Sequence, residues 1–161
     1  LQMGTFDVSE IFQFAIRIEE NGEKFYRKVA GKSTEKTIKD LFNFLADEEV
    51  KHKKTFSAMV SRIEKYEPAE TYPGEYFQYL KSYADTIIFP PEIEKEMNCE
   101  KNMSCIIDFA IRRELDSIMY YLETKSFVNE TQHEMLDKII EEERRHFVKL
   151  SQIKTRLNKE T

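Results

Sequence analysis

The chain has 161 residues, of which 34% are charged, and it contains only four glycines and four prolines. This composition favours long helices in one domain spanning residues 1–161, and it argues against a turn-rich β fold. The net charge of −5, with no separate basic stripe, argues against a nucleic-acid or anionic-membrane surface. No stretch approaches the roughly 18 apolar residues of a membrane span, and no signal peptide is recognisable, so we expect a cytoplasmic protein. Cys99 and Cys105 match no zinc or redox spacing, and we expect reduced thiols.

Four long amphipathic helices are predicted from the apolar periodicity. Their ranges are residues 9–31, 33–65, 104–127 and 129–158. Ser9 is a suitable N-cap for the first helix and Gly31 a suitable stop, while Asn129 and Gln132 form a capping box at the start of the last. Because only a few residues connect the first pair and the last pair, each pair is predicted to be an antiparallel hairpin.

The connection between the second and third helices is different. Residues 66–103 hold all four prolines and Gly74, with a short helix predicted over residues 75–85. A long crossover of this kind lets the helices before and after it run parallel. The sequence therefore predicts an all-α four-helix bundle made of two hairpins that are joined by a long crossover with a short extra helix.

One motif occurs twice along the chain. The segment Ala15–Tyr26 recurs as Ala110–Tyr121, a shift of 95 residues. Each copy is followed about thirty residues later by Glu-x-x-His, first as Glu49 with His52 and then as Glu143 with His146, a shift of 94 residues. The two hairpins thus have the same internal plan.

The repeated acids lie inside the apolar stripes of their helices. Steps of three and four residues place Glu19 on the same face as Phe12, Ala15 and Tyr26, whereas its neighbour Glu20 falls on the polar face. The same reading places the other repeated residues within the core-facing stripes: Glu49, His52, Glu114, Glu143 and His146. A third Glu-x-x-His, at Glu130 and His133, lies outside the repeat at the start of a helix and is interpreted as surface.

Four buried carboxylates near one another would repel strongly. They could be protonated or paired with arginine, or a compensating cation could lie among them. Four carboxylates carry −4 and two divalent cations carry +4, and neutral histidines would complete the ligand shell. One Glu from each of two helices and Glu-x-x-His from each of two others is the arrangement of di-iron and di-manganese carboxylate bundles.

These residues resemble the rubrerythrin-like branch of the ferritin-like superfamily. The resemblance rests on four motifs: Glu19-x-x-Gly22-x-x-Phe25-Tyr26, Glu49-x-x-His52, Glu114-x-x-Ser117-x-x-Tyr120-Tyr121 and Glu143-x-x-His146. It implies that Glu19, Glu49, His52, Glu114, Glu143 and His146 hold two iron ions, with Glu49 and Glu143 as bridging carboxylates. It also implies that Tyr26 and Tyr121 hydrogen-bond ligand carboxylates of the opposite half. The alternative for these tyrosines is a role as ordinary core aromatics.

The chain departs from that family in two respects. It contains no Cys-x-x-Cys pair of the kind that holds the rubredoxin-like iron, so electrons would come from another protein or reductant. Ser117 stands where rubrerythrins carry a further carboxylate, which puts efficient peroxidase activity in doubt. Gly22 and Ser117 occupy equivalent positions, and small residues there could allow close helix approach or leave a pocket for an oxidant.

The expected function is that of a di-iron redox protein that reacts with hydrogen peroxide or dioxygen. The alternatives are iron binding for storage or sensing, and a non-catalytic interaction module that a metal site stabilises. A manganese catalase-like activity is a minor alternative. Manganese or zinc could replace iron at such ligands. The expected partners are an external electron donor and a second copy of the chain in a homodimer.

Overall fold

The computed structural model describes residues 8–66, 74–85 and 102–160, and every regular element in these ranges is helical. The α-helices are α1 (Val8–Lys32), α2 (Lys36–Tyr66), α3 (Gly74–Tyr83), α5 (Met103–Thr124) and α6 (Glu130–Glu160), with a 3-10 turn, η2 (Lys125–Phe127), after α5. The all-α prediction is confirmed, and the four long helices start and end within a few residues of the predicted limits.

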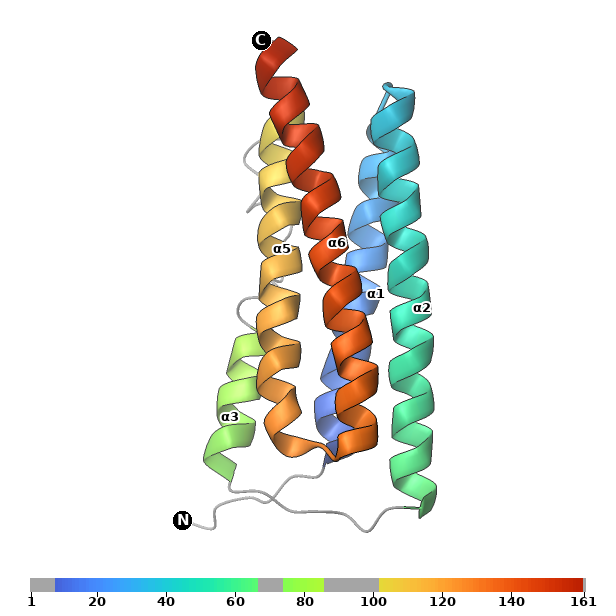
Figure 1. The fold of residues 1–161 in the computed structure, drawn as a ribbon, viewed down its shortest axis with the longest axis vertical. Helices are drawn as coiled ribbons and strands as arrows, with labels where there is room; N and C mark the ends of the chain where they lie inside the picture. The colour runs from blue at the N-terminus through green and yellow to red at the C-terminus, as the bar shows by residue number, and fades with distance from the viewer. Residues whose placement is uncertain (1–7, 67–73, 86–101, 161) are drawn as a thin grey trace.

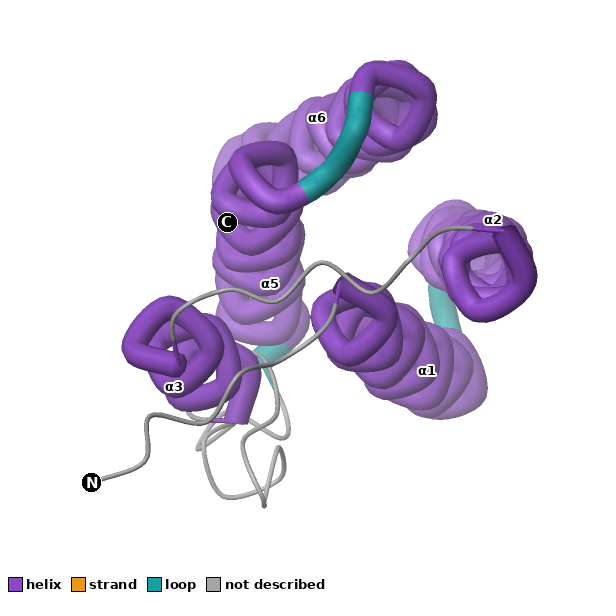
Figure 2. The backbone as a smooth tube through the Cα atoms, turned by 90° about the horizontal axis from the view of Figure 1, so that it is seen from below, coloured by secondary structure: helices purple, strands orange, loops and turns teal. Residues whose placement is uncertain are grey.

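The long helices form two hairpins. α1 packs along α2, and α5 packs along α6 (Figure 1). α2 and α5 run in the same direction, as expected if a long crossover joins them. The view in Figure 2 shows α3 beside α5. Tyr83 of α3 stacks on Tyr120 of α5 with ring centroids 6.3 Å apart, and its hydroxyl donates a hydrogen bond to the Asp116 carbonyl at 3.2 Å.

Two apolar clusters fill the interior, one on each side of a polar layer. The first contains Phe12, Phe56, Tyr121 and Leu136, and the second contains Phe25, Phe42, Ile107 and Leu150. Along α1 the first cluster precedes Glu19 and the second follows it, and along α2 the order is reversed around Glu49. Full burial of one such side chain contributes roughly 1.5–3 kcal/mol, so the clusters offset the cost of desolvating the polar layer.

The predicted caps of α1 are wrong. The helix already includes Val8, so Ser9 lies inside it and is buried rather than capping it. Gly31 also lies inside the helix, which continues to Lys32, and no glycine in the described ranges has a positive φ. A cap contributes only about 1 kcal/mol, so the packing of neighbouring residues can extend a helix past its local signals.

In the second hairpin, formed by α5 and α6, the helix starts agree more closely with the sequence prediction. The predicted capping box is present, since Asn129 Oδ1 accepts from the Gln132 backbone N–H at 3.0 Å and Gln132 Oε1 accepts from the Asn129 N–H at 3.1 Å. At α5 the N-cap is Asn102, whose Oδ1 accepts from the Ser104 N–H at 3.0 Å. The predicted start of this helix was therefore one residue late.

Two further expectations concern the state of the cysteines and the presence of a membrane span. Cys105 is disulfide-bonded, which corrects the expectation of a reduced thiol, while Cys99 lies outside the described residues. Cysteine spacings identify metal and redox motifs, and they do not determine whether a cysteine forms a structural disulfide. Within the described ranges, no helix combines the length and the apolar character that crossing a bilayer requires.

Candidate metal centre

The polar layer gathers the repeated residues of all four long helices. α1 contributes Glu19 and α5 contributes Glu114, while α2 and α6 each contribute a glutamate and a histidine one turn apart. The six side chains are buried: Glu19, Glu49, His52, Glu114, Glu143 and His146. Helical periodicity explains the convergence, because residues three and four apart share the face that each helix turns to the core.

The six side chains form two overlapping groups that could each hold a metal ion. One group comprises Glu19, Glu49, His52 and Glu143, and the other comprises Glu49, Glu114, Glu143 and His146. Within each group the candidate ligand atoms lie within 4.8 Å of one another. Glu49 and Glu143 belong to both groups, so the two groups share two carboxylates.

Several polar atoms of this layer lack a hydrogen-bond partner. Among the described residues, Glu19 Oε2, Glu114 Oε2 and His52 Nδ1 are buried without one. His52 Nδ1 lies 3.4 Å from Glu19 Oε2, and His146 Nδ1 lies 3.6 Å from Glu114 Oε2. A buried polar atom without a partner costs roughly 1–3 kcal/mol, and a bound cation removes that cost by taking the lone pairs as ligands. The donor set therefore fits a pair of metal ions.

Burial and mutual repulsion raise the pKa of two carboxyl groups of the layer, whereas hydrogen bonds and histidine charge lower the pKa of a third. Burial, reinforced by the charges of Glu19 and Glu143, raises the pKa of Glu49 well above its usual range. Burial and Glu143 likewise raise the pKa of Glu114. Burial also disfavours ionisation of Glu143, but hydrogen bonding to Glu114 and the charge of His52 hold its pKa well below the usual range. The chain by itself thus keeps protons within the layer.

Both histidines are held in the charged form. Burial lowers the pKa of His52, but the carboxylates of Glu143 and Glu19 outweigh burial and raise it to about 12. Burial is likewise outweighed at His146, where Glu114 and Glu143 raise the pKa to about 10. These protons offset the carboxylate charge in the chain by itself, and they must leave before the imidazoles can act as metal ligands.

Two tyrosines connect the hairpins across the layer. The Tyr26 hydroxyl of α1 donates a hydrogen bond to Glu114 Oε1 of α5. The Tyr121 hydroxyl of α5 donates in the reverse sense, to Glu19 Oε1 of α1. Both hydroxyls are buried, and the negative charge nearby, together with burial, raises the pKa of each phenol. The tyrosines therefore remain neutral donors that fix the orientation of the two carboxylates.

Glu142 is a functional candidate that the sequence prediction missed. Its Oε2 lies 2.8 Å from Nε2 of His52, the ring nitrogen that faces away from the carboxylates. A carboxylate at this position holds the imidazole ring in place and leaves Nδ1 directed toward the layer. In the sequence, Glu142 is marked only as the middle residue of the unbroken run Glu141–Glu143. Such a run does not specify which of its residues contacts another helix, because that depends on tertiary packing.

Glu20 and the pair Glu130 and His133, which the sequence analysis assigned to the surface, lie outside the polar layer. Glu20 is half-exposed, and its Oε1 lies 3.9 Å from Lys53 Nζ. His133 binds the Lys125 carbonyl through Nε2 at 2.6 Å, near the start of α6. Glu130 is exposed. None of the three belongs to either candidate ligand group.

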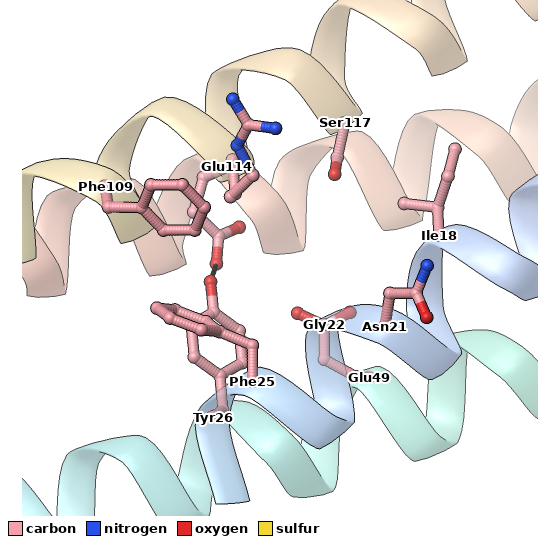
Figure 3. A pocket seen from close by; sticks show the side chains of 10 residues that line it. Ile18, Asn21, Gly22, Phe25, Tyr26, Glu49, Phe109, Glu114 and Ser117 are labelled. Carbon is pink, nitrogen blue, oxygen red and sulfur yellow. Dashed lines mark hydrogen bonds between the residues drawn. The ribbon is translucent and has the colours of Figure 1, made fainter. Parts of the chain in front are cut away.

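A cavity of about 30 Å³ opens beside the polar layer (Figure 3). Its wall is formed by α1 and α5 together with Glu49 of α2, and it includes Asn21, Gly22, Arg113 and Ser117. A Cβ atom at Gly22 would lie 3.2 Å from Glu49 Cδ and 3.4 Å from its Cγ. Glycine at this position therefore accommodates the Glu49 carboxylate, and Gly22 and Ser117 both border the cavity.

Comparison with known proteins agrees with this geometry. Residues 10–154 match the family model described as Rubrerythrin. A crystal structure from Thermotoga maritima, described as a ferritin-like diiron-carboxylate protein, is 31% identical in sequence, with a TM-score of 0.73. The match covers 94% of this chain and 96% of that chain. None of the curated proteins matches significantly. The bundle thus has the ferritin-like fold that the sequence resemblance implied.

Proposed function

The chain belongs to the rubrerythrin family, and we propose that it is a redox protein that binds two iron ions and reacts with hydrogen peroxide or dioxygen. The proposed ligands are Glu19, Glu49, His52, Glu114, Glu143 and His146. Glu49 and Glu143 are the proposed bridging residues, because each belongs to both candidate ligand groups. The observation that carries the proposal is this pair of overlapping, buried groups with unpartnered carboxylate and imidazole atoms.

Charge balance supports two divalent cations at this position. The four carboxylates carry −4 when ionised, and two divalent ions carry +4, so a neutral buried centre results without further counter-ions. When bound, the iron ions would supply the electrons for reduction of the oxidant. Tyr26 and Tyr121 hold the carboxylates of Glu114 and Glu19, and Glu142 holds the His52 ring.

The cavity offers space for a small oxidant beside the proposed ligands. It reaches Glu49 and Glu114, which are both proposed ligands, and Tyr26 lies on its wall. A volume of about 30 Å³ accommodates roughly two water-sized groups, which suits peroxide or dioxygen. The proposed electron donor is another protein or a small reductant.

Oxidation of bound iron tests the proposal. Protein loaded with ferrous iron under anaerobic conditions is mixed with peroxide or oxygen, and the near-ultraviolet absorption of ferric iron is followed over time. We expect oxidation to be faster than that of free iron in the same buffer. The Glu19→Gln variant should lose metal and rate together, whereas Glu20→Gln, one residue away and half-exposed, should behave as the parent protein.

Two outcomes would count against the proposal, one against the redox function and one against the ligands. Oxidation no faster than in buffer would refute it and would favour the alternative in which the metal only stabilises an interaction module. Equal loss of iron in Glu19→Gln and Glu20→Gln would refute the ligand assignment.

The proposed homodimer has one supporting observation. Leu115, Met119 and Leu122 are exposed at helical spacing on α5, where they form a single apolar stripe. Light scattering on the native protein measures the assembly directly, and a monomer at high concentration would contradict the dimer.

A further inference from the structure

The outer face of α5 and the neighbouring α3 carry most of the exposed apolar side chains. Six large apolar side chains are exposed among the described residues, and four of them lie on these two helices: Leu115, Met119 and Leu122 on α5, and Tyr79 on α3. α5 lies at the edge of the bundle, with α3 on one side and α6 on the other (Figure 2). Such a concentration of apolar side chains on one face is typical of an interaction surface.

The spacing of these residues on α5 suits packing against a second helix. Arg112, Leu115, Met119 and Leu122 follow one another at steps of three, four and three residues. This alternation is the pattern by which two long helices pack along each other, and it places the four residues on one stripe of about three turns. The stripe begins with a cation and continues with three apolar side chains, so its partner must offer an anion beside an apolar seam.

A groove of about 490 Å³ lies at the opposite end of the stripe, between α3 and the end of α5. It is lined by two carboxylates, two aromatic rings and a hydroxyl: Glu75, Glu123, Tyr79, Phe127 and Ser126. Both carboxylates and the Tyr79 ring are exposed. A guanidinium group binds carboxylates through its N–H donors and stacks on aromatic rings. The groove therefore complements an arginine side chain in charge and in shape.

The arginine that begins the stripe fits this groove in a second copy of the chain. Arg112 is exposed. A two-fold axis perpendicular to α5 sets the helix antiparallel to its copy, and it can place Leu115 opposite Met119 of the second copy. Arg112 lies about 4.5 Å along the helix from Leu115, and Glu123 lies about 6 Å from Met119 in the matching direction. In this register Arg112 of each copy lies beside Glu123 of the other.

We propose that two copies of the chain pair through this face of α5, antiparallel about a two-fold axis, with Arg112 of each copy in the groove of the other. The inference rests on the proposed homodimer and assigns its interface. The contact is isologous, so the pairing of Arg112 with Glu123 occurs twice. None of the six proposed metal ligands lies on this face, since all six are buried, and the pairing is therefore independent of metal.

Reversal of charge tests the pairing of Arg112 with Glu123, with sedimentation equilibrium as the measurement. Arg112→Glu and Glu123→Arg each put like charges at both contacts, and each should raise the Kd of the dimer at least about tenfold. An equimolar mixture of the two variants should pair as tightly as the parent protein, because both contacts of a heterodimer then join opposite charges. Arg62→Glu changes an exposed arginine of α2 and alters the net charge equally, and it should change Kd by less than about twofold.

Substitution within the apolar seam provides a second measurement. Met119→Glu should be monomeric at concentrations where the parent protein is dimeric, because a carboxylate would be buried in the seam. Val148→Glu is the matched control, since Val148 of α6 is 49% exposed and Met119 is 51% exposed, and it should pair as the parent protein does. The helical circular dichroism of every variant should equal that of the parent protein, because all the substituted side chains are exposed.

The outcomes separate this interface from the proposed homodimer. A dimeric parent protein whose Kd is unchanged in Met119→Glu would overturn the interface and leave the homodimer in place. Unchanged pairing in both charge variants, or weakened pairing without recovery in their mixture, would overturn the contact of Arg112 with the groove. A monomeric parent protein would overturn the interface and the proposed homodimer together, whereas the oxidation of bound iron is measured independently of both.

Discussion

Replacing Gly22 with alanine should affect the folded chain and the metal centre in opposite directions. Gly22 lies inside α1, where alanine is favoured over glycine by about 0.8–1.0 kcal/mol. The added Cβ would lie 3.2 Å from Glu49 Cδ, whereas ordinary carbon–carbon contacts are about 3.5–4.0 Å. Glu49 must therefore retreat by a few tenths of an ångström.

The magnitudes follow from these two effects. The metal-free Gly22→Ala protein should gain up to about 1 kcal/mol, which raises the Tm of a chain of this size by about 2–4 °C. Disturbing the support of a metal ligand typically costs 10–100-fold in affinity, which is about 1.4–2.7 kcal/mol of the stabilisation from one bound metal. The metal-loaded variant should therefore be less stable than the metal-loaded parent, by roughly 0.4–1.7 kcal/mol.

Gly31→Ala provides the matched control within the same helix. No heavy atom lies within 4 Å of the Cβ that this change would add, and Gly31 has no positive φ. It should leave metal affinity unchanged, and it should shift the stability of the metal-free and metal-loaded forms equally.

The assay combines thermal unfolding of both forms with a metal-competition titration. Opposite changes in Tm for the two forms of Gly22→Ala, with no such divergence in Gly31→Ala, are the expected result. If Gly22→Ala retains the metal affinity of the parent protein, then Glu49 either is not a ligand or moves without cost. In that case the reasoning from the close approach is refuted.

Three other results are expected. Metal binding at pH 7 should release at least two protons, one from each imidazole, since the pKa values of about 12 for His52 and about 10 for His146 keep both rings charged. Protons that the raised pKa values keep on Glu49 and Glu114 add to this number, whereas imidazoles with ordinary values near 6.5 would release about half a proton in total. Metal affinity should consequently rise with pH. The stability that the charged rings give the metal-free chain is full below about 6.5, and it is lost as pH rises through about 10 for His146 and through about 12 for His52. Proton release in weak buffer on metal binding measures the charged state of the rings, and release of fewer than one proton would contradict it. Tyr26→Phe should lower metal affinity by about tenfold by freeing the Glu114 carboxylate, as a competition titration would show, and an unchanged affinity would mean that the phenol only packs. Glu142→Ala should lower metal affinity by a similar factor, because the contact of Glu142 with the His52 ring is lost. The hyperfine-shifted proton NMR spectrum of the cobalt-loaded protein measures the effect on the ring, and a spectrum identical to that of the parent protein would contradict it.

The fold and the clustering of the six candidate ligands were predictable because both depend on helical periodicity. A glutamate inside an apolar stripe must reach the interior wherever the helix packs, so Glu19 and Glu114 converge without knowledge of the crossover. The duplication strengthened the prediction, since the same pattern in two hairpins is improbable for unrelated surface residues. Glu20 was separated from Glu19 by the same argument.

The residues that support the layer were harder to predict. Glu142 follows Glu141 and precedes Glu143, and its contact with His52 depends on the distance and rotation between α6 and α2. Arg113 is half-buried beside Glu114, and the partners that its guanidinium finds depend on how the helices pack around it. Helical periodicity specifies the face on which a residue lies and not the partner that a long side chain reaches.

The duplicated motif produces two halves that are alike in their ligands and different in their surroundings. Glu142 contacts His52, but Glu48, its counterpart in the first hairpin, pairs with Lys51. The cavity borders Glu49 and Glu114, both of which belong to the ligand group of His146. Glu19 and His52, which belong to the other group alone, do not line it.

The two candidate ligand groups therefore differ in the carboxylate that contacts the histidine and in their contact with the cavity. On the proposed ligand assignment, the group of Glu19 and His52 has an extra carboxylate beside its imidazole and reaches the cavity only through the shared Glu49. The group of Glu114 and His146 reaches the cavity through Glu49 and through its own Glu114. Departure from the internal repeat, at Gly22 opposite Ser117 and at Glu142 opposite Glu48, is therefore what makes the surroundings of the two candidate ligand groups differ.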